Sequence, residues 1–386
     1  MIESLLSNFS MLLPGFGVAV AVAWTLVHTR DLHVHLTGDH PDSGPQKLHT
    51  VATPRVGGLA VMSGLLAGLI WLYFTAVPPL RSQLDGLHPV GLLAGLLPLF
   101  VLGLLEDIWQ TVSVRLRLAV SLASGALAYG MAGLRVVGLG LPGIDAFIQS
   151  QPLLALLFPM FFTLVAVAGL VHAMNIVDGL NGLLAGITLV ILGVLATVAA
   201  RFDEAALVLL ALSGMAATAG FAVFNFPRAR LFCGDGGAYL LGYLVAVIVI
   251  LLVLRQPTIS PWFALAVVIH PVTETLYSAW RRFRLGLSPT HPDARHMHSL
   301  WAGLLQRRSE ETGVPIWLGP NAAASWRTWA IASLPVLLAG TCPTQAMVLQ
   351  VICAIYVALF ILTVRTLERP VFRQVSVPYF SDDRKS

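Results

Sequence analysis

Carboxylate and amide side chains stand at the ends of long apolar runs in this sequence. Glu106 and Asp107 close one such run. Asn175 and Asp178 close another in the segment NIVDGLNG, and Asp235 lies between glycines in the segment CGDGG. Acidic residues inside a bilayer are costly and usually functional, because backbone and side chains there find no water. This repeated placement predicts a reaction site where several membrane helices meet water.

The types and spacing of these residues favour phosphate and metal chemistry. Asp235 between glycines can present a carboxylate beside free backbone N–H groups, which suits a hard cation that carries phosphates. The segment lacks the GxxxxGK[ST] pattern of a P-loop. Asn175 and Asp178 are three residues apart and share a helical face, and the adjacent acids Glu106 and Asp107 repel each other unless a cation lies nearby. Each feature also has a purely structural alternative. Glu106 and Asp107 could be a solvated helix cap, the segment of Asn175 and Asp178 a glycine-rich seam between packed helices, and the segment of Asp235 a plain turn between helices.

Cationic side chains gather in two further loops. Phosphate oxygens are bound well by such donors, whereas the spacing of the histidines is poor for zinc. A basic loop attracted to anionic lipid is the alternative. Arg115 and Arg117, beside the acid pair, are ordinary basic loop residues or partners for phosphate. The candidate phosphate-binding residues of the two loops are Lys47, His49, Arg55, Arg295, His296 and His298.

The composition describes an all-α polytopic membrane protein. Charged residues make up 11% of the 386 residues and hydrophobic residues 57%, whereas a soluble domain has about 25% charged residues. Apolar runs near the span length of about 20 residues recur along the chain. We expect about ten to eleven transmembrane helices, at residues 11–28, 56–77, 89–105, 117–136, 152–171, 183–200, 205–224, 237–254, 261–280, 329–341 and 345–364.

The distribution of basic residues predicts the orientation. With the N-terminus outside, only Arg81, Arg135, Arg201 and Arg255 of the 23 Lys and Arg residues fall on the outside, as the positive-inside rule requires. All the dense chemistry then lies on the cytoplasmic face, which argues against a cation-coupled transporter. We expect one integral membrane domain over residues 1–386 with a mobile cytoplasmic tail at 365–386, and the three cysteines give no disulfide framework.

Taken in order, five motifs carry a resemblance to a known family. They are TPRVGG, GLLEDIW with RLRL, NIVDGLNGLLAG, NFPRARLFCGDGGA and PDARHMHSL, within about residues 45–300. The chain resembles the polyprenyl-phosphate sugar-1-phosphate transferases, the membrane superfamily of glycosyltransferase family 4. The resemblance implies transfer of a sugar-1-phosphate from a UDP-sugar to undecaprenyl phosphate with Mg²⁺ (Mn²⁺ as an alternative), release of UMP, and a place in a bacterial inner membrane. An N-acetylhexosamine donor is favoured.

The resemblance also implies roles for individual residues. Glu106 and Asp107 match the acidic pair of the family, and Asp235 matches its later catalytic aspartate, while Asn175 and Asp178 match the asparagine–aspartate motif. His296 and His298 match the histidine loop that faces the diphosphate of the nucleotide sugar.

The sequence departs from the family pattern at Asn181, where many members carry a second aspartate, so this residue is retained as a substrate-binding candidate. Further departures are Glu106 in place of aspartate, Ala294 in place of arginine and Ser299 in place of histidine.

A mechanism follows from these assignments. Asp235 is expected to bind the metal with Asn175 as a neutral ligand, and Asp107 with Glu106 to position or deprotonate the lipid phosphate. Glu274, near the inside end of the ninth helix, is expected to pair with Arg281 or Arg282. The alternative function is a membrane phosphatase or other phosphotransferase on prenyl phosphates. A nucleic-acid partner is not expected, and a homodimer is left open.

Overall fold

The computed structural model describes residues 12–39, 52–288 and 295–372. Within these ranges the regular secondary structure is helical, apart from one antiparallel pairing of the two-residue strands β1 (Gly38–Asp39) and β2 (Thr53–Pro54). The helices are α2 (Leu13–His28), α3 (Arg30–Thr37), α4 (Gly58–Thr75), α5 (Pro78–Asp85), α6 (Pro89–Trp109), α7 (Val114–Ala132), α8 (Pro142–Ser150), α9 (Pro152–Val177), α10 (Leu183–Arg201), α11 (Ala205–Asn225), α12 (Gly234–Arg255), α13 (Pro261–Val267), α14 (Ile269–Arg284), α15 (Met297–Thr312), α16 (Pro320–Thr341) and α17 (Ala346–Phe372).

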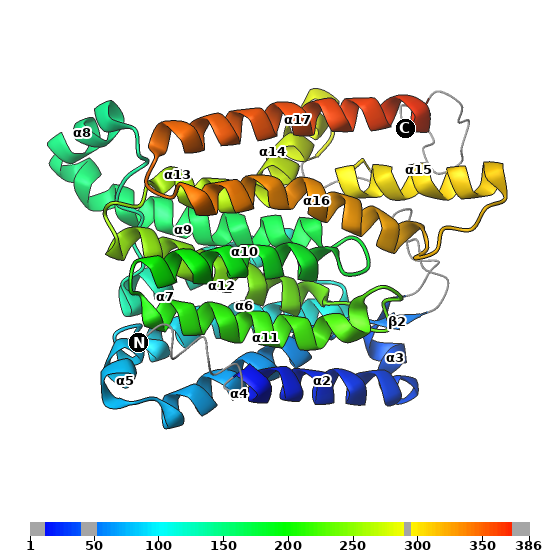
Figure 1. The fold of residues 1–386 in the computed structure, drawn as a ribbon, viewed down its shortest axis with the longest axis horizontal. Helices are drawn as coiled ribbons and strands as arrows, with labels where there is room; N and C mark the ends of the chain where they lie inside the picture. Colours follow the sequence, from blue (N-terminus) through cyan, green and yellow to red (C-terminus); the bar gives the residue numbers. More distant parts are fainter. Residues whose placement is uncertain (1–11, 40–51, 289–294, 373–386) are drawn as a thin grey trace.

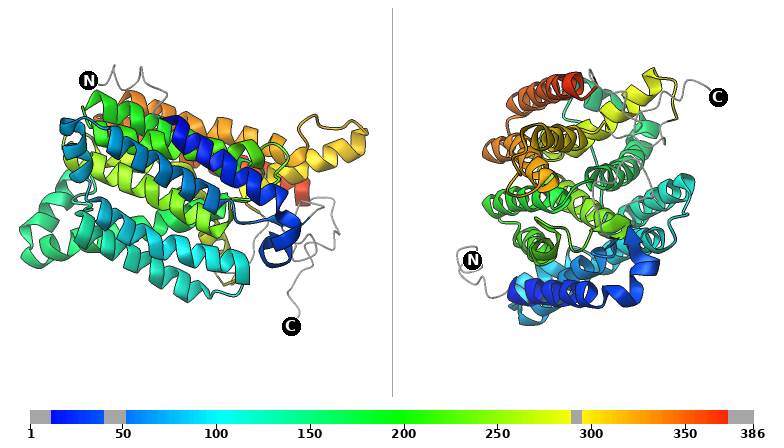
Figure 2. Two further views of the ribbon diagram at one scale, coloured as in Figure 1. Left: turned by 90° about the horizontal axis from the view of Figure 1, so that it is seen from below. Right: turned by 90° about the vertical axis from the view of Figure 1, so that its right-hand side faces the viewer.

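Each of the eleven predicted ranges contains a helix, and the fold class is confirmed. Among the described residues, seven helices are long and apolar enough to cross a membrane: α4, α6, α9, α10, α11, α12 and α17. The helices α2, α7 and α16 are shorter or more polar and lie in the same bundle of roughly parallel helices (Figure 2). The orientation with the N-terminus outside stays a prediction.

The ninth predicted helix is divided at Val268 into α13 and α14. Pro271 explains the break, because proline has no N–H and its ring clashes with the carbonyl four residues earlier, at Val267. Four further helices, α3, α5, α8 and α15, were not predicted. Helix α17 continues to Phe372, so the first residues of the predicted mobile tail are helical.

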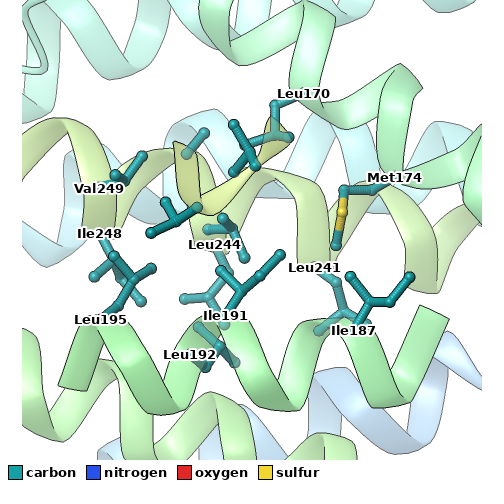
Figure 3. Packing of buried hydrophobic residues seen from close by; sticks show 14 of the residues in the cluster. Leu170, Met174, Ile187, Ile191, Leu192, Leu195, Leu241, Leu244, Ile248 and Val249 are labelled. Atoms are coloured by element: carbon teal, nitrogen blue, oxygen red, sulfur yellow. The ribbon is translucent and has the colours of Figure 1, made fainter. Parts of the chain in front are cut away.

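Helix α12 lies at the centre of the bundle. Of its apolar window, 89% is buried, against 28% for α9 and for α17. Its neighbours on two sides are α9 and α10, and Figure 3 shows their side chains interleaved. Leu241 and Leu244 of α12 lie there beside Met174 of α9 and Ile191 of α10. Burial on all sides explains why α12 is apolar all round rather than on one face.

Glycines bring three helices into backbone contact at one end of α12. A Cβ on Gly58 of α4 would collide with the backbone of Gly237, and one on Gly103 of α6 with the backbone of Gly236. Larger residues at these positions would push the helices apart. The same end of the bundle carries β2, α3 and α15 (Figure 1), whereas α8 lies at the other end.

Candidate active site

The N-terminus of α12 is capped by a carboxylate from another helix. Asp107, near the end of α6, accepts the backbone N–H of Asp235 at 2.8 Å with one oxygen and that of Gly236 at 3.0 Å with the other. Its side chain is buried, and negative charge is stabilised at a helix N-terminus. Gly234 has a φ of +73°, and a Cβ there would collide with Asp107 and with the carbonyl oxygen of Arg55.

Two arginines and a tyrosine surround the carboxylate of Asp235. Arg117 lies 3.3 Å from Oδ2 and Arg55 lies 3.5 Å from Oδ1. The hydroxyl of Tyr239, one turn further along α12, donates to Oδ2 at 3.3 Å. The side chains of Arg55 and Arg117 remain 25% and 23% exposed, so both guanidinium groups can also reach an incoming anion.

Glu106 and Asp107 are adjacent in sequence and have different surroundings. Glu106 accepts the backbone N–H of Val112 at 2.8 Å and lies 3.7 Å from Arg117. Asp107 lies 3.8 Å from Arg55. Each acid therefore has its own arginine, which supplies the cation that two neighbouring carboxylates require.

Asn175 lies in the last turn of α9, and Asp178 directly follows that helix and faces Asp235. The nearby backbone of Gly234 lowers the pKa of the Asp178 carboxyl group, against the larger effect of burial. Burial, reinforced by the charge of Asp235, raises the pKa of Asp178 to about 7. Asp178 and Asp235 are thus close enough to repel each other, and Arg55 opposes that effect.

Two asparagines join the loop after α9 to the loop before α12. Asn225, buried at the end of α11, accepts the backbone N–H of Gly182 and donates to the carbonyl of Leu231, both at 2.8 Å. Asn181 donates to the carbonyl of Pro227 at 2.9 Å. The side chain of Asn181 borders a cavity of about 470 Å³, whose other lining residues include Arg228, Gln306, Ser309, Glu310 and Asn321.

The histidine loop packs against the loop after α9. His296 precedes α15 and His298 lies in its first turn, and their rings stack in parallel with centroids 5.4 Å apart. Nε2 of His298 occupies the place that a Cβ on Gly179 would need. Burial lowers the pKa of His298 to about 3, so its ring is neutral at physiological pH.

The structure brings most of the predicted site residues to one end of the bundle. Arg55, Glu106, Asp107, Asp178 and Asp235 form one cluster, and the histidines join it through Gly179. Lys47 and His49 lie outside the described residues. Arg295 is half-buried directly before His296.

Three contacts in the structure were not predicted from the sequence. Tyr239 is four residues after Asp235 on one helix, and this spacing could have identified it. Asn225 gave no signal beyond its place after an apolar run. Glu274 was predicted to pair with Arg281 or Arg282, and this was wrong in the described structure: its carboxylate binds His296 at 2.9 Å, while Arg281 lies 3.9 Å from Glu368 of α17. The pairing of Glu274 with His296 was not predicted because the two residues are 22 positions apart in the sequence.

Comparison with known proteins gives the class. The family model described as glycosyl transferase family 4 matches residues 89–253. The undecaprenyl-phosphate alpha-N-acetylglucosaminyl 1-phosphate transferase of Yersinia pestis is 31% identical over 66% of this chain and 67% of its own length. The enzyme of the same description from Escherichia coli strain K12 is 29% identical over 66% of each chain. The decaprenyl-phosphate N-acetylglucosaminephosphotransferase of Mycolicibacterium smegmatis is 29% identical over 65% of each.

The fold and these matches define an integral membrane transferase. The chain belongs to glycosyl transferase family 4, among the polyprenyl-phosphate N-acetylhexosamine-1-phosphate transferases.

Proposed function

We propose that this protein transfers N-acetylglucosamine-1-phosphate, or a closely related sugar-1-phosphate, from a UDP-sugar to undecaprenyl phosphate and releases UMP. The relatives from Yersinia pestis and Escherichia coli support the acceptor and the sugar by their descriptions. The observation that carries the proposal is the cluster around Asp235: three carboxylates and two partly exposed arginines meet at the N-terminus of a buried helix. The product would begin a lipid-linked surface glycan at the cytoplasmic face of a bacterial inner membrane.

The physical problem is the approach of two anions at a membrane surface. Arg55 and Arg117 are placed to bind phosphate oxygens, because each guanidinium is a planar, permanently charged donor. A phosphate monoester has a second pKa near 6, so most of the lipid phosphate is dianionic at pH 7 without a general base. Asp107 then acts by holding Asp235 and the start of α12 in place, since both of its oxygens accept backbone N–H groups.

A magnesium ion fits the donor set. Mg²⁺ is bound in enzymes by one or two carboxylates together with substrate phosphates, and it prefers oxygen ligands. Asp235 would hold it with Asn175 as a neutral ligand, and Asp178 adds a second carboxyl group close to Asp235. The described residues contain no group of three His, Cys, Asp or Glu side chains that could hold a metal alone. When bound, the ion would neutralise the diphosphate for in-line displacement.

The remaining residues are assigned to the nucleotide sugar. His296 and His298, with Arg295 directly before them, would face its diphosphate, because the loop that carries them packs against the loop holding Asp178. Asn181 would contact the donor at the polar cavity beside it. Lys47 and His49 are proposed as further phosphate ligands from their sequence positions alone.

The test is UMP release by purified protein in detergent with undecaprenyl phosphate, Mg²⁺ and UDP-N-acetylglucosamine. We expect UMP only when all three are present, and at least a hundredfold slower release from Asp235→Asn. Glu204→Gln is the matched control, because Glu204 pairs with Arg255 at the far end of α12 and its loss should leave the rate unchanged. Release of inorganic phosphate from the lipid without UMP would identify a phosphatase and refute the proposal.

A further inference from the structure

A buried carboxylate outside the Asp235 cluster holds the histidine loop. Glu274 of α14 is fully buried, and its Oε1 accepts the Nδ1–H of His296 at 2.9 Å. The backbone N–H of Met297, the first residue of α15, lies 3.3 Å from both carboxylate oxygens. Ser278, one turn further along α14, places its hydroxyl oxygen 3.2 Å from the same histidine nitrogen.

These contacts fix both the chemistry and the position of His296. A histidine that donates from Nδ1 to a carboxylate is held in one tautomer and one ring orientation, and its Nε2 is left as the outward nitrogen. The bond from Met297 makes Glu274 a cap for the N-terminus of α15, which otherwise has no side-chain cap. One carboxylate therefore sets the ring of His296 and the start of the helix that carries His298.

The effect of Glu274 reaches the loop after α9 through ring stacking. His298 lies in parallel over His296, and its Nε2 touches the backbone of Gly179, the neighbour of Asp178. A shift of His296 or of the first turn of α15 would move His298 off this backbone. Among the described residues, Glu274 contacts His296 and Met297 rather than Asp178 or Asp235, so its influence on the reaction is indirect.

We propose that Glu274 is a positioning residue, which fixes His296 through Nδ1 and thereby seats His298 against Gly179 for binding of the nucleotide-sugar diphosphate. This inference rests on the proposed function, because the two histidines are assigned there to the donor. The proposed role of Glu274 differs from that of the carboxylates in the Asp235 cluster, which are proposed to face the metal and the phosphates.

The variant that tests this role is Glu274→Gln, which keeps the shape and removes the charge. In either orientation of the new amide, its NH₂ group faces a donor, either the N–H of Met297 or the Nδ1–H of His296. We expect kcat/KM for UDP-N-acetylglucosamine to fall about 10- to 100-fold, by analogy with the loss of a hydrogen-bond partner that orients a metal-ligating histidine. The KM for undecaprenyl phosphate should change less than about twofold. Glu204→Gln is again the control.

Two further measurements distinguish positioning from a general loss of structure. In a double-mutant cycle, Glu274→Gln and His296→Gln should be strongly non-additive, because both remove the same link. In protein labelled with ¹⁵N-histidine, the protonated Nδ1 signal that His296→Gln removes should also be lost or shifted in Glu274→Gln. If Glu274→Gln does not fold, Glu274→Asp, which keeps the charge and withdraws it by one methylene, should give a smaller defect of the same donor-specific kind.

The outcomes are separable. Activity of folded Glu274→Gln equal to wild type, equal losses for both substrates, or additive effects in the cycle would overturn the positioning role. Silence of the wild-type protein in the UMP assay would instead refute the proposed function, and the ¹⁵N comparison would still show whether Glu274 sets the tautomer of His296.

Discussion

Asp107 and Asp235 are joined through a backbone: the carboxylate of the first accepts the N–H of the second at 2.8 Å. The side chain of Asp235 is consequently free to face Arg55, Arg117 and Tyr239. The two aspartates therefore have different structural roles, which their positions in the sequence do not distinguish. One orders the start of a helix, and the other is presented at its surface.

Asp107→Asn should therefore lower stability as well as activity. An amide can accept only one of the two backbone N–H groups and turns its NH₂ towards the other, so a buried donor loses its partner at a cost of about 1–3 kcal/mol. We expect a clear fall in the melting temperature of the detergent-solubilised protein, measured by intrinsic fluorescence. Glu106→Gln, which retains an acceptor for the N–H of Val112, should shift it much less. Equal shifts in the two variants would contradict the capping role.

Arg117→Lys should lower kcat/KM about tenfold or more. Arg117 bridges Glu106 and Asp235, and a lysine is a single point charge that cannot span both carboxylates as the guanidinium fork does. Arg115→Lys is the control, because Arg115 lies exposed on the same helix. Steady-state kinetics of UMP release with both variants checks this, and equal rates for Arg117→Lys and wild type would exclude a bridging role.

Gly179→Ala should nearly abolish activity. The new methyl group would occupy the place of Nε2 of His298, and neither the loop backbone nor the buried ring can move freely. Gly303→Ala, in α15 with open space around its Cα, should be tolerated and slightly stabilising, since alanine favours a helix over glycine by about 1 kcal/mol. A fully active Gly179→Ala enzyme would show that activity does not require the contact between His298 and the backbone of Gly179.

The neutrality of His298 predicts a dependence of stability on pH. Its pKa is lowered by burial to about 3, whereas an unfolded histidine has a pKa of about 6.5. Below pH 6.5 the unfolded chain binds a proton that the folded protein does not. Stability contributed by the neutral ring is therefore lost as the pH falls, by up to about 1.4 kcal/mol per pH unit.

The corresponding experiment compares melting temperatures at pH 7 and pH 5. The decrease should be smaller in His298→Gln than in wild type, while His35→Gln, which alters an exposed ring, should leave it unchanged. An identical decrease in all three proteins would mean that His298 is not buried as a neutral group.

Much of the fold could be predicted from apolar runs, because a membrane span has a required length and tolerates few charges. Pro271 causes the break at Val268, but the sequence did not predict it, because a proline early in an apolar run is also compatible with an unbroken helix. Helix α15 was not predicted because its composition is mixed and its first turn is fixed from outside, by Glu274. Helix propensity, which depends on local sequence, cannot predict such a contact.

The candidate site was predictable to the extent that its residues are costly in an apolar chain. Asp107, Asp178 and Asp235 stand out for that reason, and the structure places them together. Their division of labour was not predictable, because it depends on which backbone N–H group each carboxylate meets. The pairing of Glu274 with His296 across 22 residues likewise depends on the path of the chain and not on local spacing.

The glycine contacts between α4, α6 and α12 have a consequence for how the site responds to its surroundings. Where main chains touch without side chains between them, no rotamer change can alter their separation. The half of the site that carries Arg55, Asp107 and Asp235 should therefore keep its dimensions in membranes of different thickness or composition. Among the described residues, the half that carries His296 and His298 is held by the side-chain contacts of Glu274 and His298, so we expect any adjustment to different donor sugars to fall on that half.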